Sequence, residues 1–205
     1  MITEQLIEDL DLPDYYKWSE YIWDCDHWWD YILDDFVAEC DEFGVDIDKA
    51  SISFDIYHRT CASKGRVITD SGFVKEYYDD LAGISPVLTQ MVQEGMLKVS
   101  WGGYITINVD DNWSEGEVFN SGLFAGTSVA ELWEIDRHNF DEFEDCITAI
   151  IKDLHSDLLK ELTSAYEWDT SEERYKESLL EQIHEAVWMQ QQSTTVLNKT
   201  TTTGE

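Results

Sequence analysis

Three carboxylate–histidine pairs have the spacing that could hold a metal ion. Each places an acid three residues before a histidine, namely Asp24 and His27, Asp55 and His58, and Glu181 and His184. On a helix this spacing points both side chains the same way, as di-iron bundles require. Such a bundle also needs two further inward glutamates, and residues 51–58 predict a strand instead. We therefore expect solvated or capping histidines with no metal and no cofactor, and a metal-dependent hydrolase is the third alternative.

A cysteine nucleophile is the other chemistry that the sequence offers. Cys61 lies three residues after His58, and Arg59 and Lys64 beside it would lower a thiol pKa. Residues three apart on one strand face opposite sides, so the pair needs a turn. No Gly-x-Ser-x-Gly elbow, phosphate loop or Gly-x-Gly-x-x-Gly motif is present. We expect no enzyme, and we interpret the acid-free segment His58–Arg66 as a loop paired to acidic surface, or as an anion or partner contact.

The carboxylates themselves are the strongest feature, with 44 Asp or Glu against 13 Lys or Arg and a net charge of −31. This charge repels nucleic acid and anionic membranes and attracts basic protein surfaces. The acids are clustered: residues 1–48 hold sixteen against the single Lys17, and residues 110–145 hold eleven against Arg137. Nine Trp, ten Tyr and eight Phe are too many aromatic residues for a merely solvating chain. We expect an acidic surface that faces a partner, with solvation alone as the alternative.

The expected partner-binding set has two acidic clusters and three aromatic anchors. The first cluster recurs at three- and four-residue intervals and comprises Glu20, Asp24, Asp26, Asp30, Asp34, Asp35, Glu39 and Glu42. The second comprises Asp110, Asp111, Glu115, Glu117, Asp141, Glu142, Glu144 and Asp145. Exposed aromatic residues that could anchor an interface are Trp23, Trp28 and Trp113. Like charges at i,i+4 destabilise a helix, so retaining them suggests a use.

The elements that must position these residues follow from hydrophobic periodicity. An apolar stripe predicts one long helix from about Asp14 to Phe43, ended by Gly44, and comprises Trp18, Ile22, Cys25, Trp29, Ile32, Phe36, Cys40 and Phe43. Alternation predicts strands at 51–58 and 66–69, and residues 97–109 predict a hairpin with a two-residue Gly102-Gly103 turn. Ser85-Pro86 opens a helix to about Gly95. Two C-terminal helices begin near Asp141 and after a capping box at Thr170–Glu173. The order indicates an α+β fold with a small antiparallel sheet.

Length and composition favour a single acidic domain over residues 1–192, or a core with an appended helical region, followed by a disordered Thr-rich tail over residues 193–205. Cys25, Cys40, Cys61 and Cys146 lack zinc-site spacing, so we expect free and mostly buried thiols. No secretory signal and no apolar stretch of membrane-spanning length is evident. We expect a cytoplasmic protein that binds neither membrane nor nucleic acid directly, and a homodimer is left open.

Several segments together resemble a group of uncharacterised bacteriophage proteins. They are Phe43–Ile47 after the acidic helix, the strand Ile52–Ile56, the Gly102-Gly103-Tyr104 hairpin and the segment Tyr166–Glu173. The resemblance spans most of residues 15–185. The segment Tyr57–Gly65 departs from it, since that group has a Gly-Asp-Gly-Ala type of loop there. The resemblance implies phage origin and no mechanism.

Charge and resemblance together favour one function. We expect a phage-encoded, non-enzymatic inhibitor whose carboxylates mimic the phosphate array of DNA, acting in the host cytoplasm on a basic, nucleic-acid-binding defence protein or nuclease. The anti-defence role is an analogy with acidic phage DNA mimics. The alternative is an acidic adaptor that binds a partner unrelated to nucleic acid.

Overall fold

The computed structural model describes residues 15–24, 28–68, 72–109, 128, 131, 134 and 136–201, with the backbone alone at 15, 137 and 190–201. The fold is α+β with a four-stranded antiparallel sheet and two long C-terminal helices, as the sequence predicted. The chain divides into two compact units. The first unit comprises Met1–Trp28 with Ser164–Glu205, and the second comprises Trp29–Thr163. Each has buried apolar residues of its own, which the overall composition could not reveal.

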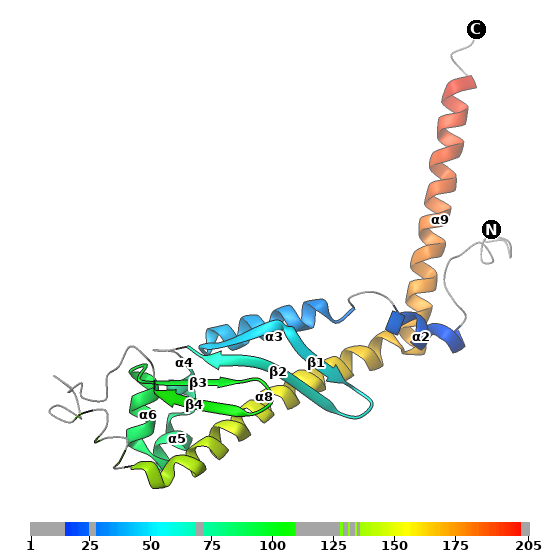
Figure 1. Ribbon diagram of the computed structural model, residues 1–205. Coiled ribbons are helices and arrows are strands. Elements are labelled where there is room, and N and C mark those ends of the chain that lie inside the picture. Colours follow the sequence, from blue (N-terminus) through cyan, green and yellow to red (C-terminus); the bar gives the residue numbers. More distant parts are fainter. Residues whose placement is uncertain are drawn as a thin grey trace. The chain divides into compact units, whose positions relative to one another are not determined.

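The second unit is built on a sheet whose strands follow chain order, β1-β2-β3-β4 (Figure 1). The strands are β1 (Val45–Asp55), β2 (Thr60–Val67), β3 (Leu97–Trp101) and β4 (Ile105–Val109), and every neighbouring pair is antiparallel. The register of β1 against β2 shifts between Asp48 and Ser53, which marks a bulge. The β1–β2 connection places Arg59 at φ 53°, in the left-handed region.

Strand side chains alternate between a buried and a solvated face, as expected of an antiparallel sheet covered on one side. Val45, Val99 and Trp101 are buried, whereas Lys64 and Lys98 on the opposite face are exposed. Gly65 allows the Trp101 ring to lie flat against β2. A Cβ at this position would lie 2.5 Å from Trp101 Cζ2 and 2.7 Å from the Asp46 carbonyl oxygen. The packing of Trp101 therefore requires glycine here.

Helices cover the buried face of the sheet (Figure 1). The helices of this unit are α3 (Asp30–Glu42), α4 (Gly72–Glu76), α5 (Tyr78–Ile84), α6 (Pro86–Gln93), η1 (Arg137–Asn139) and α8 (Phe140–Asp169) as far as Thr163. Phe73, Leu88, Met91, Phe143 and Ile147 are fully buried among them. As predicted, α6 begins at Ser85-Pro86, because the Ser85 hydroxyl accepts a 2.9 Å hydrogen bond from the Leu88 amide.

The first unit combines α2 (Tyr15–Asp24), the end of α8 from Ser164, and α9 (Glu172–Thr201). Trp18 is its most buried described side chain, only 3% exposed. The Trp18 indole N–H donates to the Asp169 carbonyl oxygen at 2.5 Å. Its ring stacks on Tyr21 at 5.2 Å and meets the edge of Tyr175 at 5.5 Å. Aromatic packing thus ties α2 to the α8–α9 junction.

The single helix expected from Asp14 to Phe43 is not confirmed. The structure has α2 and α3 instead, with Trp28 and Trp29 in a turn and residues 25–27 outside the described residues. The apolar stripe is real, but its two parts serve different units: Trp18 is buried in the first, and Ile32 and Phe36 are buried in the second. Gly44 ends α3 as expected, with φ 76° and its amide donating to the Asp41 carbonyl.

Several boundaries also differ from the prediction. Strand β1 begins at Val45, because Val45 and Ile47 alternate with Asp46 and Asp48, and β2 spans Thr60–Val67 instead of 66–69. The hairpin is confirmed, but its loop has three residues, since Trp101 pairs with Ile105. Ser171, not Thr170, caps α9, accepting from the Arg174 amide at 3.1 Å.

The C-terminal tail was expected to be disordered from Ser193, but α9 extends to Thr201. Threonine costs only about 0.7 kcal/mol or less relative to alanine in a helix, and an established helix adds one hydrogen bond per residue. Residues 202–205 lie outside the described residues. Within the described part of the chain, no helix is long and apolar enough to cross a membrane.

Candidate functional site

The first predicted acidic cluster is distributed over both units. Glu20 and Asp24 are exposed on α2 in the first unit, and Asp26 lies outside the described residues. The other members lie on α3 in the second unit, where Asp30 is half-buried and Asp34, Asp35, Glu39 and Glu42 are exposed. The carboxylates expected on one helix therefore belong to two helices in separate units.

Two sides of α3 differ in charge. On one side, the ammonium of Lys49 from β1 lies 2.5 Å from the Asp34 carboxylate and donates to the Asp30 carbonyl oxygen at 3.4 Å. This contact neutralises Asp34, a member of the first predicted acidic cluster. Asp35 and Glu39 follow each other one turn apart, and among the described residues neither forms an ion pair. The Asp35–Glu39 side of α3 therefore keeps its negative charge.

Two acids of α8 extend this charge. Burial raises the pKa of Glu161, and the nearby carboxylates of Glu39 and Asp157 raise it further. Asp35 adds to the same effect. We call Asp35, Glu39, Asp157 and Glu161 the α3–α8 acidic cluster. Asp157 also pairs with Lys160 at 2.7 Å, so the cluster holds one local cation.

The negative potential continues towards the α4–α5 turn. Burial raises the pKa of the Tyr77 phenol, and the charges of Glu76, Asp153 and Asp157 contribute to the shift. Burial, reinforced by Glu39, raises the pKa of Cys40 to about 12. Carboxylates one turn apart on α8, at Asp153, Asp157 and Glu161, were the available sequence signal for this extension. The spacing of these acids alone does not predict the extension, because no local pattern shows that α8 lies near α3.

The second predicted cluster is only partly described. Asp141, Glu142 and Asp145 are exposed and Glu144 is half-buried, all at the start of α8. Negative charge near a helix N-terminus is stabilised by the helix dipole, which gives these acids a structural reason. The remaining members, Asp110, Asp111, Glu115 and Glu117, lie outside the described residues together with Trp113.

The other two predicted anchors take part in the packing of the first unit. The Trp23 ring meets the edge of Tyr166 at 5.8 Å and is 39% exposed. The Trp28 ring lies 5.6 Å from the same tyrosine and is half-buried. Both rings therefore stabilise this unit, and their role as interface anchors stays a prediction.

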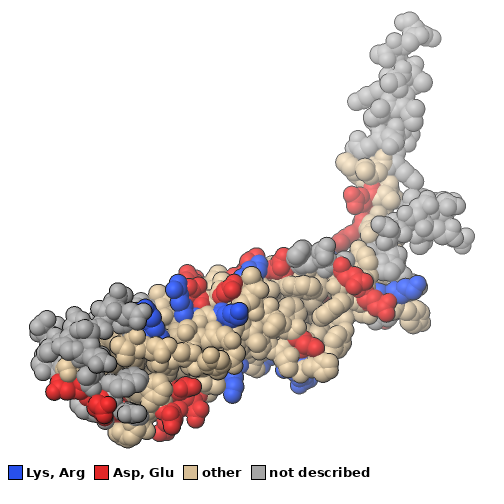
Figure 2. All heavy atoms as spheres, in the orientation of Figure 1, with Lys and Arg blue, Asp and Glu red and all other residues tan. Residues whose placement is uncertain are grey.

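Basic side chains are interspersed with the acids. Figure 2 shows Lys and Arg among Asp and Glu over the second unit, with uncharged surface between them. The basic segment His58–Arg66 forms the end of the β1–β2 turn and most of β2. Arg66 binds the Asp46 carboxylate across the strands at 2.8 Å. The segment was expected to be a loop, but Thr60–Arg66 belongs to strand β2, and Arg66 pairs with an acid of the neighbouring strand.

The carboxylate–histidine pairs do not gather into a larger cluster where they are described. His58 Nδ1 lies 2.7 Å from Asp55 Oδ2, and Asp55 also accepts from the Tyr57 and His58 amides. His184 is exposed on α9, and His27 lies outside the described residues. Among the described residues, no group of three or more His, Cys, Asp or Glu could hold a metal ion.

The described cysteines are free thiols, as the sequence predicted for them. Burial raises the pKa of Cys61 to about 11, so it is a neutral thiol at physiological pH. His58 lies against Asp55 in the turn before β2, and no hydrogen bond between His58 and this thiol is found among the described residues.

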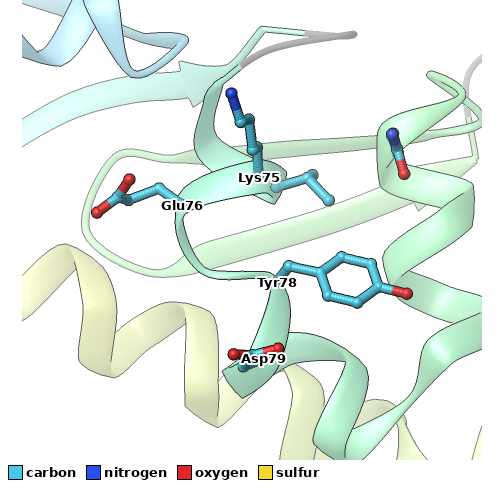
Figure 3. Close-up of a pocket in the computed structure, with 6 residues that line it drawn as sticks. Lys75, Glu76, Tyr78 and Asp79 are labelled. Atoms are coloured by element: carbon cyan, nitrogen blue, oxygen red, sulfur yellow. The ribbon is translucent and has the colours of Figure 1, made fainter.

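A shallow hollow lies between α4, α5 and α6, lined by Val74, Lys75, Glu76, Tyr78, Asp79 and Gln93, with a volume of about 420 Å³. Figure 3 shows the Tyr78 ring extending along it, with the side chains of Glu76 and Asp79 on different sides. Lys75, Glu76, Tyr78 and Asp79 are exposed, so water solvates their charges. Catalysis needs polar groups held in a desolvated pocket, and this hollow does not provide one.

A buried serine–histidine pair joins the sheet to α8. Ser63 Oγ on β2 lies 2.8 Å from His155 Nε2, and the Trp101 indole N–H donates to the same oxygen at 3.4 Å. Which of the two atoms donates depends on the tautomer of the His155 ring, because the Ser63 hydroxyl can accept a second hydrogen bond as well as donate one. Burial lowers the pKa of His155, which keeps the ring neutral. The pair thus joins β2 to α8, with Ser63 buried and His155 half-buried.

This pair predicts a pH dependence of stability. The folded pKa of His155 is below its ordinary value near 6.5, so the stabilisation is complete above that pH and is lost as the pH falls through the folded pKa. The free energy of unfolding of the parent should fall between about pH 8 and about pH 5.5 by more than that of His155→Gln. Urea unfolding at both pH values measures the difference, and parallel pH profiles would contradict it.

Comparisons with known proteins do not extend this picture: no protein-family model, no curated protein and no solved structure matches the chain.

Proposed function

We propose that the protein is a non-enzymatic inhibitor that occupies the basic, nucleic-acid-binding surface of another protein. The α3–α8 acidic cluster is the observation that supports this function most directly. Three of its four members, Asp35, Glu39 and Glu161, form no ion pair among the described residues. The phage origin implied by the resemblance belongs to the same proposal, and so does a host defence protein as target, which is an analogy with acidic phage DNA mimics.

The spacing of the cluster supports nucleic-acid mimicry. Carboxylates four residues apart on a helix rise by about 6 Å, and two such rows, on α3 and α8, give one charge per roughly 3 Å. Duplex DNA carries one charge per ~1.7 Å of axis and a single strand one per ~3.4 Å. The cluster thus approaches the charge density of one phosphate strand. A groove that binds such a strand would meet a similar array.

The energetics also favour use in binding. Like charges held together destabilise the free protein, and the raised pKa of Glu161 reflects that repulsion together with burial. A lysine or arginine from a partner would relieve the repulsion and lower the pKa of Glu161 again. Binding should therefore release a proton at mildly acidic pH and weaken as the pH falls, because protonated carboxyls attract cations poorly.

The proposal predicts that duplex DNA and this protein compete for one surface. The full chain, immobilised as bait, should retain proteins from a bacterial host lysate that duplex DNA elutes. Retention should decrease steeply between about 50 and 200 mM salt, because the contacts are mainly electrostatic. A retained protein that binds the bait and its DNA at the same time would contradict mimicry and favour an acidic adaptor. Mimicry would also be contradicted if neither salt nor DNA released the retained proteins.

A further inference from the structure

One side of α9 is exposed although it carries large apolar residues. Leu180 is 54% and Trp188 58% exposed, and the exposed His184 lies between them at four-residue spacing. The other side of the helix packs within the first unit, where Ile183 is buried and Tyr175 meets the Trp18 ring. The described residues of the first unit thus leave one largely apolar stripe of α9 open to solvent. This stripe is formed by Leu180, His184 and Trp188.

The charge of α9 is divided along its length. Residues 172–185 hold five acids with Arg174 and Lys176, whereas residues 186–204 hold no acid and only Lys199. In a chain with 44 acids among 205 residues, an acid-free run of this length is unusual. Like-charge repulsion opposes contact between two strongly acidic chains. Along α9, that repulsion is weaker over the acid-free second half than over the first.

We propose that α9 pairs with α9 of a second copy of this chain, with the two helices antiparallel and centred on His184. This arrangement places Leu180 of one copy against Trp188 of the other, so each apolar side chain gains an apolar partner. It also places Glu177 and Glu173 opposite positions 191 and 195 of the acid-free half. Glu173, Glu177, Leu180, His184 and Trp188 are all exposed on one face in the single chain, as this pairing requires.

The antiparallel direction follows from charge. A parallel pair would bring Glu173 and Glu177 of one copy against the same two residues of the other. Arg174 lies 3.5 Å from Glu177 in its own chain, which reduces that repulsion for only one of the two acids. The antiparallel pair avoids it completely. Dimerisation through α9 in the first unit does not involve the α3–α8 acidic cluster, so it stands independently of the proposed function.

Sedimentation equilibrium of the full chain tests the pairing. We expect a dimer at about 50 µM, and we expect Leu180→Gln and Trp188→Gln each to raise the dissociation constant at least about tenfold, the effect of removing an interface anchor. Tyr104→Gln is the matched control, since Tyr104 is 79% exposed in the second unit, and it should remain dimeric. Unchanged circular dichroism would confirm that the variants fold. A monomeric parent, or α9 variants as dimeric as the control, would overturn the proposal.

Opposite charges introduced at position 191 test the direction. In the antiparallel pair this position lies opposite Glu177 of the second copy, so Gln191→Lys should strengthen the dimer and Gln191→Glu should weaken it. In a parallel pair both variants would place like charges together and both would weaken it. Weakening by Gln191→Lys would therefore overturn the antiparallel arrangement.

Discussion

Replacing Asp35, Glu39 and Glu161 together by their amides should lower the affinity for a DNA-displaceable partner at least about tenfold at low salt, and chiefly through a slower association rate. These carboxylates are exposed, and exposed charges act mainly on the rate of diffusional encounter and are screened by salt. The stability of the variant should hold or rise, because neighbouring like charges are removed. Stopped-flow association at several salt concentrations measures the effect.

A second triple variant separates the cluster from overall charge. Asp79→Asn, Asp80→Asn and Glu94→Gln change the net charge equally at exposed positions elsewhere in the second unit. This control should keep most of the parental association rate. Equal losses in both variants would show that only net charge matters. Unchanged association of the cluster variant at low salt would mean that these carboxylates are merely solvated.

Ser85→Ala should destabilise the second unit by about 2–4 kcal/mol, because one hydroxyl serves two buried groups. Its oxygen caps α6 by accepting from the Leu88 amide at 2.9 Å, and its proton is donated to the Asp136 carboxylate. Ser85 is fully buried and Asp136 is 7% exposed, so water cannot replace the lost donor. Among the described residues, Asp136 would then keep one side-chain hydrogen bond, which the Asn139 side-chain amide donates at 2.8 Å. Urea unfolding followed by circular dichroism measures the loss.

A matched variant isolates the contribution of the cap. Ser171→Ala removes the cap of α9 in the first unit, but it does not deprive a buried carboxylate of a hydrogen-bond donor. This substitution should therefore lower the free energy of unfolding by only about 1 kcal/mol. If Ser85→Ala costs no more than this, the hydrogen bond to Asp136 contributes little.

Local periodicity was sufficient for the elements that pack along a single face. The helix predicted to begin near Asp141 is confirmed as α8, which buries Ile147, Ile151, Leu158 and Leu162, and Ser85-Pro86 located the start of α6. The same periodicity failed at Trp28 and Trp29, because an unbroken stripe does not show whether its two halves pack against one core. The start of β1 was missed although Val45 and Ile47 alternate with acids.

The candidate site shows the same limit. Asp35 and Glu39 were predicted from spacing on one helix, but Asp157 and Glu161 join them only through the tertiary placement of α8. Spacing also could not show that Asp34 is neutralised by Lys49, which comes from a strand. Sequence identifies the carboxylates that share a helix face. Which of them keep their charge depends on what the fold brings beside them.

The bulge in β1 has a consequence for aggregation. β1 is an edge strand, and an unpaired edge can recruit strands from other molecules. At neutral pH the net charge of −31 opposes the approach of another molecule to this edge, but acid protonates the carboxylates and removes that repulsion. The register shift between Asp48 and Ser53 interrupts the regular edge and does not depend on pH. The edge is therefore protected against fibril growth by its shape when charge no longer protects it.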